Sequence, residues 1–188
     1  MKMRLTFHAG LILIAGLLQG CAVVPGARDG ARTVPDRSAS EAYREDQKIE
    51  SRAVDLIYEQ FRIFMHVNVT SFKRNVLISG EVPDETTRTA IEKIVSGMEG
   101  VRHVNNELVI SGNSSLASRS NDSMITSNIK LRFARDKSIK TDRIKVVTEN
   151  GTVFLMGDAG RAEADAAAEI ASTTSRVKRV VKLFEYAD

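Results

Sequence analysis

The chain has 188 residues, 27% of them charged and 43% apolar, with a formal net charge of +3, which allows one ordinary domain or two small ones. Its single cysteine excludes an internal disulfide and a thiolate metal cage. The three histidines, His8, His66 and His103, lie far apart, and none has a neighbour at the spacing of metal ligands. No serine or threonine stands in a nucleophile-elbow setting, so the sequence favours a non-enzymatic protein without metal or cofactor.

The first twenty residues are typical of a bacterial export signal. Lys2 and Arg4 precede the apolar run Ala9–Leu18, which is too short to cross a hydrocarbon core that needs roughly 20 residues. The run ends in Leu18-Gln-Gly-Cys21, which resembles the lipobox of bacterial lipoproteins. That resemblance implies that residues 1–20 are removed and that Cys21 is acylated. The alternative is an ordinary signal peptide with an incidental cysteine.

The residues after the lipobox indicate where the protein is sorted and how it is tethered. By resemblance to enterobacterial sorting, a residue other than aspartate after the cysteine, here Ala22, implies transfer to the outer membrane. Residues 21–40 are rich in Gly, Pro, Ser, Ala and Arg without a period, and we expect a flexible tether there. Residues 113–121 have the composition of a second linker.

The remaining chain contains two copies of one pattern. Val67–Gly80 aligns without a gap on Ile144–Gly157, at a constant offset of 77 residues. Apolar residues alternate in both segments, which predicts two half-buried strands joined by a hairpin turn. Gly80 and Gly157 fall inside the strand pattern, where a missing side chain usually permits a bulge or a close backbone approach.

Helical patterns flank each hairpin. Asp84 stands where a helix N-cap is expected, and a last strand closes each copy, over residues 101–110 and 177–186. Each copy therefore reads α-β-β-α-β, and we expect an α+β fold with two helices on one face of a three-stranded mixed sheet. The apolar helical stripes are Ile49, Ala53, Leu56, Ile57 and Phe61; Ile91, Ile94, Val95 and Met98; Ile125, Ile129 and Phe133; and Ala167, Ile170 and Ala171.

This order of elements, with its Val-x-Val and Val-x-Leu/Ile-x-Gly strand pair and a closing Val-x-x-Val, resembles the BON domain. Two such domains, expected over residues 41–112 and 122–188, resemble the dual-BON outer-membrane lipoproteins when they follow a lipobox. The resemblance is closest in the second copy, over Val146–Gly157 and Val177–Val180. It implies a non-enzymatic, lipid-anchored protein that faces the periplasm. It further implies binding of anionic phospholipid, such as phosphatidylglycerol, through the second BON domain, support of outer-membrane integrity, and concentration at division sites.

The charge of each segment bears on that implication. Residues 41–112 carry a net charge of −3, residues 122–188 carry +2, and Lys130–Lys145 alone carries +5. Near an anionic membrane surface each cation contributes on the order of 1 kcal/mol, which salt removes. The second copy should therefore be attracted to such a surface and the first repelled. A charge run is also common as a plain solvated face, and the sequence leaves both interpretations open.

The helix predicted to begin near Asp122 adds an apolar element beside these cations. Met124 and Leu131, seven positions apart, fall on the face opposite the core stripe, as in helices that lie at a membrane interface. The dual-BON lipoproteins have tryptophan at the position of Met124, and methionine lacks the indole, so we expect shallower insertion. The alternative is that Met124 packs between the two domains. The predicted lipid-contacting patch consists of Met124, Leu131, Arg132, Arg135 and Lys137.

Two other functions could use the same features. A basic patch also suits nucleic acid, but an exported lipoprotein seldom meets nucleic acid, and we expect none as a partner. A three-stranded sheet with a free edge can accept a strand from another protein. A protein–protein interaction module that serves an envelope assembly machine is therefore the main alternative to phospholipid binding.

Overall fold

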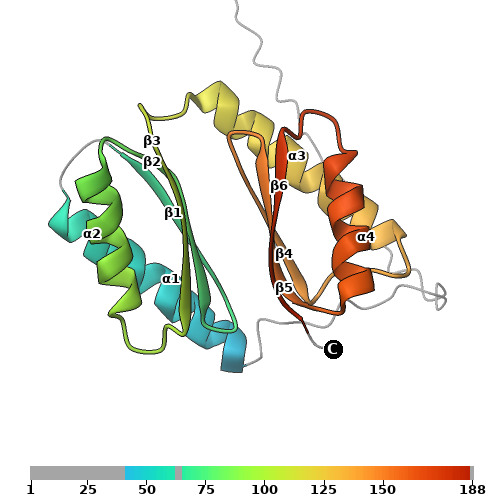
Figure 1. The fold of residues 1–188 in the computed structure, drawn as a ribbon, viewed down its shortest axis with the longest axis horizontal. Helices are drawn as coiled ribbons and strands as arrows, with labels where there is room; N and C mark the ends of the chain where they lie inside the picture. Colours follow the sequence, from blue (N-terminus) through green and yellow to red (C-terminus); the bar gives the residue numbers. More distant parts are fainter. Residues whose placement is uncertain (1–40, 62–64, 187–188) are drawn as a thin grey trace, which may run out of the picture. The chain divides into compact units, whose positions relative to one another are not determined.

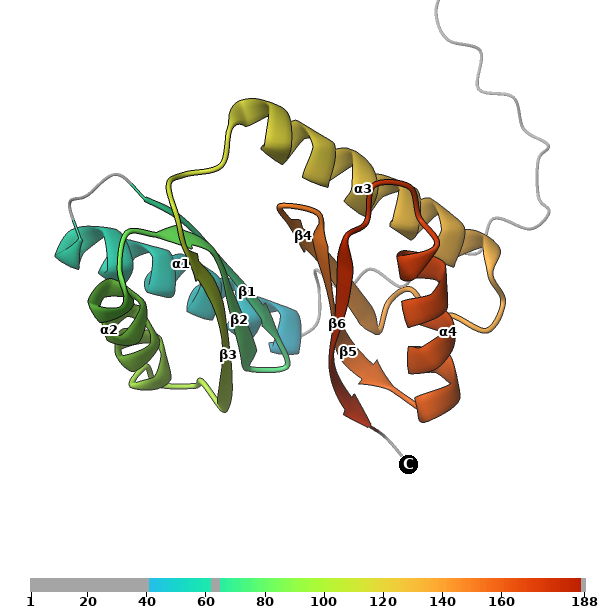
Figure 2. The same ribbon diagram turned by 45° about the horizontal axis from the view of Figure 1, so that its top comes forward.

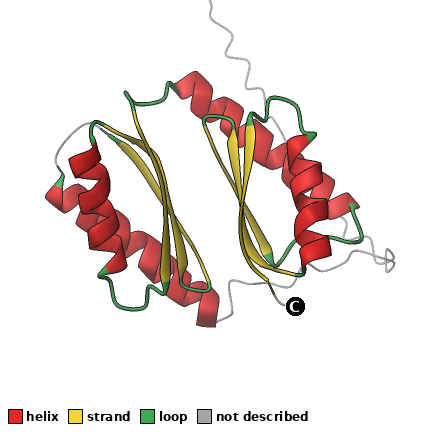
Figure 3. Cartoon of the chain, in the orientation of Figure 1, coloured by secondary structure: helices red, strands yellow, loops and turns green. Residues whose placement is uncertain are grey.

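The computed structural model describes residues 41–61 and 65–186, so the predicted signal peptide, Cys21 and the tether lie outside the described residues. Within these ranges the order α-β-β-α-β occurs twice, and each copy has two helices on one face of a three-stranded mixed sheet (Figure 1, Figure 3). This confirms the predicted α+β architecture. The first copy consists of α1 (Glu41–Gln60), β1 (His66–Phe72), β2 (Asn75–Val82), α2 (Glu85–Ser96) and β3 (His103–Ile110), and the second of α3 (Leu116–Arg135), β4 (Ile144–Glu149), β5 (Thr152–Ala159), α4 (Arg161–Ser172) and β6 (Arg179–Tyr186).

The two sheets have the same topology and register. In each, the hairpin strands pair antiparallel and the last strand adds parallel to the second, in the orders β1-β2-β3 and β4-β5-β6. Val69 faces Ile78 in the first hairpin, and Val146 faces Leu155 in the second. A parallel neighbour requires a crossover connection, which α2 and α4 provide. The 77-residue repeat in the sequence is therefore a repeat of strand pairing.

Gly80 and Gly157 permit the predicted close approach between backbones. A Cβ atom added to Gly80 would lie 2.0 Å from the carbonyl oxygen of His66, and one added to Gly157 would lie 2.1 Å from that of Arg143. No side chain fits at such distances. Gly80 also has a φ of +119°, which glycine adopts far more easily than any other residue.

The first hairpin turn is closed by a contact from outside the sheet. Lys73 and Arg74 have φ of 48° and 68°, the left-handed backbone of a two-residue hairpin turn that usually contains Asn or Gly. The carboxylate of Asp46 on α1 accepts the backbone N–H groups of both residues at 2.8 Å. These hydrogen bonds offset the backbone strain of a left-handed turn without glycine.

Each copy has its own apolar core between its helices and its sheet. The predicted stripe of Ile125, Ile129 and Phe133 is buried against the second sheet, and the predicted cap residue Asp84 accepts the N–H of Thr87 at 2.7 Å. The opposite faces of the two sheets contribute to one small shared cluster. Its buried members are Phe72, Leu77, Phe154 and Met156.

The start of α3 differs from the sequence prediction. Residues 113–121 were expected to form a linker, but α3 begins at Leu116 and follows β3 after a short connection (Figure 2). Ser115 is the N-cap, and its side chain accepts the N–H of Ser118 at 3.1 Å. Serine and asparagine favour loops, yet here a capped first turn is continuous with an amphipathic helix that is held by its core contacts. None of the described helices combines the length and apolar character needed to span a membrane.

Candidate functional site

α3 presents two opposite faces with different side chains. Ile129 is fully buried, whereas Met124 and Leu131 are 54% and 57% exposed. Residues seven apart in a helix lie nearly in line along one side, so the two apolar side chains share the solvent face. Met124 therefore stands on the surface and is not part of any described core cluster.

The cations at the end of α3 are held by a folded turn. Arg135 is the last residue of the helix, and Lys137 follows it; both are exposed. Between them, the Asp136 carboxylate accepts the side-chain and backbone hydrogen bonds of Ser138 at 2.7 and 2.9 Å, which hold the pKa of Asp136 below its usual range. Ile139, which follows this turn, is buried in the core cluster of the second copy and so anchors the turn. Arg135 thus lies one helical turn after the exposed Leu131, and Lys137 follows just beyond the end of the helix.

Arg132 has different surroundings. Its guanidinium donates to the carbonyl oxygen of Ile170 at 2.5 Å and to the hydroxyls of Thr174 and Thr173 at 2.7 and 2.9 Å. These acceptors lie at the end of α4, where carbonyl groups lack partners within the helix. Arg132 therefore stabilises the packing of α3 against α4, a role that the sequence did not predict.

The other cations of the run Lys130–Lys145 differ in whether their side chains form hydrogen bonds or salt bridges. Lys145 is engaged: its Nζ donates to Glu50 at 2.9 Å and to the carbonyl oxygen of Ser71 at 2.5 Å. The remaining cations are exposed, and their side chains form no hydrogen bond or salt bridge with any residue that the structure describes. They are Lys130, Arg135, Lys137, Lys140 and Arg143. Most of the positive charge of the run is therefore free to meet an anion outside the fold.

A groove of about 600 Å³ adjoins the second half of α3. Lys130 and Phe133 line it from α3, Ile144 and Val147 line it from β4, and Glu50 lies on its other side. The groove is thus lined by both apolar and charged side chains, but Met124, Leu131 and Arg135 do not line it.

Comparison with known proteins determines the family. The BON domain matches residues 58–112 and 121–188. The chain belongs to the BON-domain family. We refer to the copy from α1 to β3 as BON1 and to the copy from α3 to β6 as BON2.

Two relatives match most of the chain, one named as an outer membrane lipoprotein and the other as a hemolysin. The chain is 35% identical over 175 residues to the outer membrane lipoprotein DolP of Haemophilus influenzae, covering 91% of each chain. It is 34% identical over 160 residues to the 21 kDa hemolysin of Actinobacillus pleuropneumoniae, covering 84% of this chain and 82% of that one. The solved C-terminal domain of CdsD from Chlamydia trachomatis covers 73% of this chain at 10% identity with a TM-score of 0.31, too low a similarity to bear on function.

The two BON domains and the similarity to DolP confirm the predicted class: this is a dual-BON outer-membrane lipoprotein, lipid-anchored and facing the periplasm. Neither comparison assigns the residues that contact lipid. The lipid-contacting role of Met124, Leu131, Arg132, Arg135 and Lys137 therefore stays a prediction.

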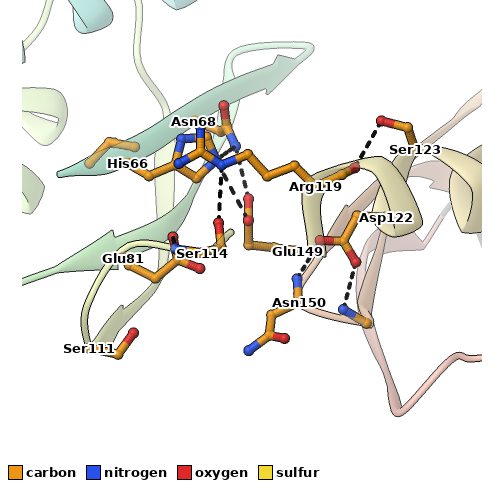
Figure 4. A network of polar contacts seen from close by, with 12 residues as sticks. His66, Asn68, Glu81, Ser111, Ser114, Arg119, Asp122, Ser123, Glu149 and Asn150 are labelled. Atoms are coloured by element: carbon orange, nitrogen blue, oxygen red, sulfur yellow. Dashed lines mark hydrogen bonds and ion pairs between the residues drawn. The ribbon is translucent and has the colours of Figure 1, made fainter. Parts of the chain in front are cut away.

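A separate cluster of buried polar groups joins BON1 and BON2 (Figure 4). Glu149, at the end of β4, accepts a hydrogen bond from Asn68 at 2.8 Å, and its other oxygen lies 3.7 Å from Nε2 of His66. Burial, together with the nearby carboxylates of Glu81 and Asp122, raises the pKa of Glu149 to about 7 although the Asn68 hydrogen bond opposes the shift. Burial also lowers the pKa of His66. No sequence pattern predicts this cluster, since its members are far apart in the chain.

Proposed function

We propose that the protein binds anionic phospholipid through the exposed face of α3 in BON2 and thereby helps to maintain the integrity of the outer membrane, without catalysing a reaction. One observation carries this proposal: exposed apolar side chains on a helix stand beside cations that have no partner within the described fold. The proposed contact surface is Met124, Leu131, Arg135 and Lys137, with Arg132 at its inner edge.

The two kinds of side chain have complementary roles at a membrane surface. Met124 and Leu131 would enter the region of the headgroups and upper acyl chains, as the apolar face of an interfacial helix does. Arg135 and Lys137 would contact lipid phosphates, each contributing on the order of 1 kcal/mol at low salt. The net charge of −3 over residues 41–112 makes BON1 a poor candidate for the same contact.

Vesicle binding of the chain that begins at Ala22 tests the proposal. This chain lacks acyl groups but contains every residue that the structure describes. We expect it to bind vesicles that contain phosphatidylglycerol but not those of phosphatidylcholine alone, and to release them as salt is raised. Binding that ignores both headgroup charge and salt would overturn the proposal.

A pair of charge reversals locates the surface. Arg135→Glu combined with Lys137→Glu should weaken binding at least about tenfold, because four units of charge change at the contact. The matched control combines Lys48→Glu with Arg52→Glu, two exposed cations of α1 in BON1, and gives the same net charge. Equal losses in the two double variants would mean that only net charge matters and that α3 is not the contact surface.

Cys21 is the residue that we propose for the lipid anchor. One acyl chain holds a protein only marginally at a membrane, whereas several chains hold it firmly. Cys21→Ser should therefore leave a protein that is soluble or still carries its leader. Recovery of that variant in the outer membrane, as for the wild type, would show that another residue or contact provides the anchor.

A protein–protein module is the alternative that one observation favours. Val109 and Ile110 at the end of β3, a strand at the edge of its sheet, are 55% and 48% exposed. An edge strand with exposed apolar residues can accept a strand from an envelope protein. Such binding would need neither anionic lipid nor low salt, so failure to bind either kind of vesicle would favour it.

A further inference from the structure

Three side chains with metal-ligating atoms meet where BON1 adjoins BON2 (Figure 4). His66 begins β1 and pairs with Glu81 on β2 in the antiparallel register, so their side chains leave the same side of the first sheet. Glu149 reaches the same place from the end of β4 in the second sheet. One imidazole nitrogen and one oxygen from each carboxylate all lie within 4.8 Å of one another.

Both carboxylates are buried, and each has an oxygen without a hydrogen bond. Glu81 and Glu149 are only 4% and 7% exposed. One oxygen of Glu81 accepts the backbone N–H of Ser114 at 3.2 Å, and one oxygen of Glu149 accepts from the side chain of Asn68 at 2.8 Å. The second oxygen of each accepts no hydrogen bond from a described residue. Neither oxygen is among the fully enclosed polar atoms that lack a partner, so both are available to a ligand, and buried carboxylates are normally paired, hydrogen-bonded or bound to a metal.

The net negative charge around the cluster also favours a bound cation. Arg119 contributes one positive charge, and its Nε donates to the hydroxyl of Ser114 at 3.2 Å. Against it stand Glu81, Glu149 and Asp122, which together give the ionised cluster a net charge of −2. A divalent ion would neutralise that charge.

We propose that His66, Glu81 and Glu149 bind one divalent transition-metal ion, for which Zn²⁺ is the best match. Zinc takes imidazole and carboxylate ligands at about 2.0–2.2 Å, and three protein ligands leave a fourth position for water. A pocket of about 390 Å³, lined by His66, Arg119 and Glu149, gives that water space. Magnesium and calcium prefer all-oxygen shells, so the imidazole selects against them.

Such an ion would cross-link the two BON domains. Two of its ligands belong to the hairpin of BON1 and the third to the hairpin of BON2. The bound ion would therefore stabilise the folded arrangement of both domains, in proportion to its concentration relative to its dissociation constant. This inference is independent of the proposed phospholipid binding.

Calorimetric titration with Zn²⁺ tests the site. The chain that begins at Ala22, stripped with EDTA and dialysed, should bind one Zn²⁺ and melt at a higher temperature with it, while Mg²⁺ should have no effect. Glu149→Gln and His66→Gln should each weaken binding at least about tenfold and abolish the thermal shift, because each removes a ligand. His103→Gln, which changes an exposed histidine of β3, should bind like the wild type.

The outcomes separate loss of a ligand from loss of the fold. Glu149→Gln keeps the side-chain shape and removes a buried charge, so its circular dichroism should match that of the wild type; His66→Gln serves as the second variant. Absence of Zn²⁺ binding by the wild type would overturn the inference. So would undiminished binding by both ligand variants, or a loss of binding in His103→Gln.

Discussion

Asp46 and Asp122 make the same contact in the two BON domains. Asp46 on α1 accepts the backbone N–H groups of Lys73 and Arg74, and Asp122 on α3 accepts both N–H groups of the Asn150-Gly151 turn, at 2.8 Å in every case. Both carboxylates are buried. A charged acceptor on the first helix thus fixes the position of each hairpin relative to that helix, and its recurrence marks it as part of the fold.

Removing this acceptor should destabilise BON2. Asp122→Ala leaves two backbone N–H groups of a partly buried turn without their charged partner, and we expect the free energy of unfolding to fall by about 2–3 kcal/mol. Urea denaturation followed by circular dichroism measures the change. The matched control is Asp55→Ala on the exposed face of α1, which should stay within about 0.5 kcal/mol of the wild type. If the two variants were equally stable, the turn would not depend on the carboxylate.

The fold was predictable where local pattern and tertiary packing agree. Alternating apolar residues in Val67–Gly80 and Ile144–Gly157 predicted both hairpins, and the 77-residue offset predicted that the two sheets would be alike. The first turns of α3 were missed because Ser and Asn favour loops locally, whereas the Ser115 cap and the core contacts further along the helix favour a continuous helix.

The candidate surface was predictable only in part. Helical periodicity was enough to place Met124 and Leu131 opposite the core, since that depends on one helix alone. A run of cations does not reveal which of them are engaged, because their partners come from distant segments: Arg132 bonds to the end of α4, and Lys145 to Glu50. The cluster around Glu149 was missed for the same reason.

One substitution at two positions of α3 tests the assignment of its faces. Ile129→Asp should lower the free energy of unfolding by more than about 4 kcal/mol, because it buries an unpaired charge in the core of BON2. Met124→Asp should change stability by less than about 0.5 kcal/mol and yet weaken binding to phosphatidylglycerol vesicles. Thermal melts and vesicle sedimentation measure the two effects. Equal melting curves for Ile129→Asp and the wild type would mean that the faces are wrongly assigned.

Arg132 and Arg135 should respond in opposite ways to the same change. Arg132→Gln removes the hydrogen bonds to the end of α4 and should cost about 1–3 kcal/mol of stability. Arg135→Gln removes an exposed cation without a described partner, so stability should hold while vesicle binding weakens. Denaturation measures the effect of each variant on stability, and a vesicle-binding assay measures its effect on lipid binding. If folded Arg132→Gln lost more vesicle binding than Arg135→Gln, Arg132 would be a principal lipid contact.

The buried position of Glu149 predicts a pH dependence of stability in metal-free buffer. Its pKa rises from 4.5 to about 7 on folding, chiefly through burial, so between these values the folded state holds a proton that the unfolded state has released. Stability from this group is therefore present below pH 4.5 and is lost as pH rises towards 7. His66 acts in the opposite sense: its lowered pKa makes the folded state less stable as pH falls below 6.5.

Comparison with Glu149→Gln isolates the glutamate from the histidine. In buffer with EDTA, the stability of this variant relative to the wild type should grow between pH 4.5 and 7, by on the order of 1–2 kcal/mol, and then level off. Glu99→Gln, at an exposed position of BON1, should show no such trend. Urea denaturation at several pH values measures both differences. A difference that is flat across this range would mean that Glu149 ionises in the folded protein as easily as in the unfolded chain, and that its surroundings already compensate its charge.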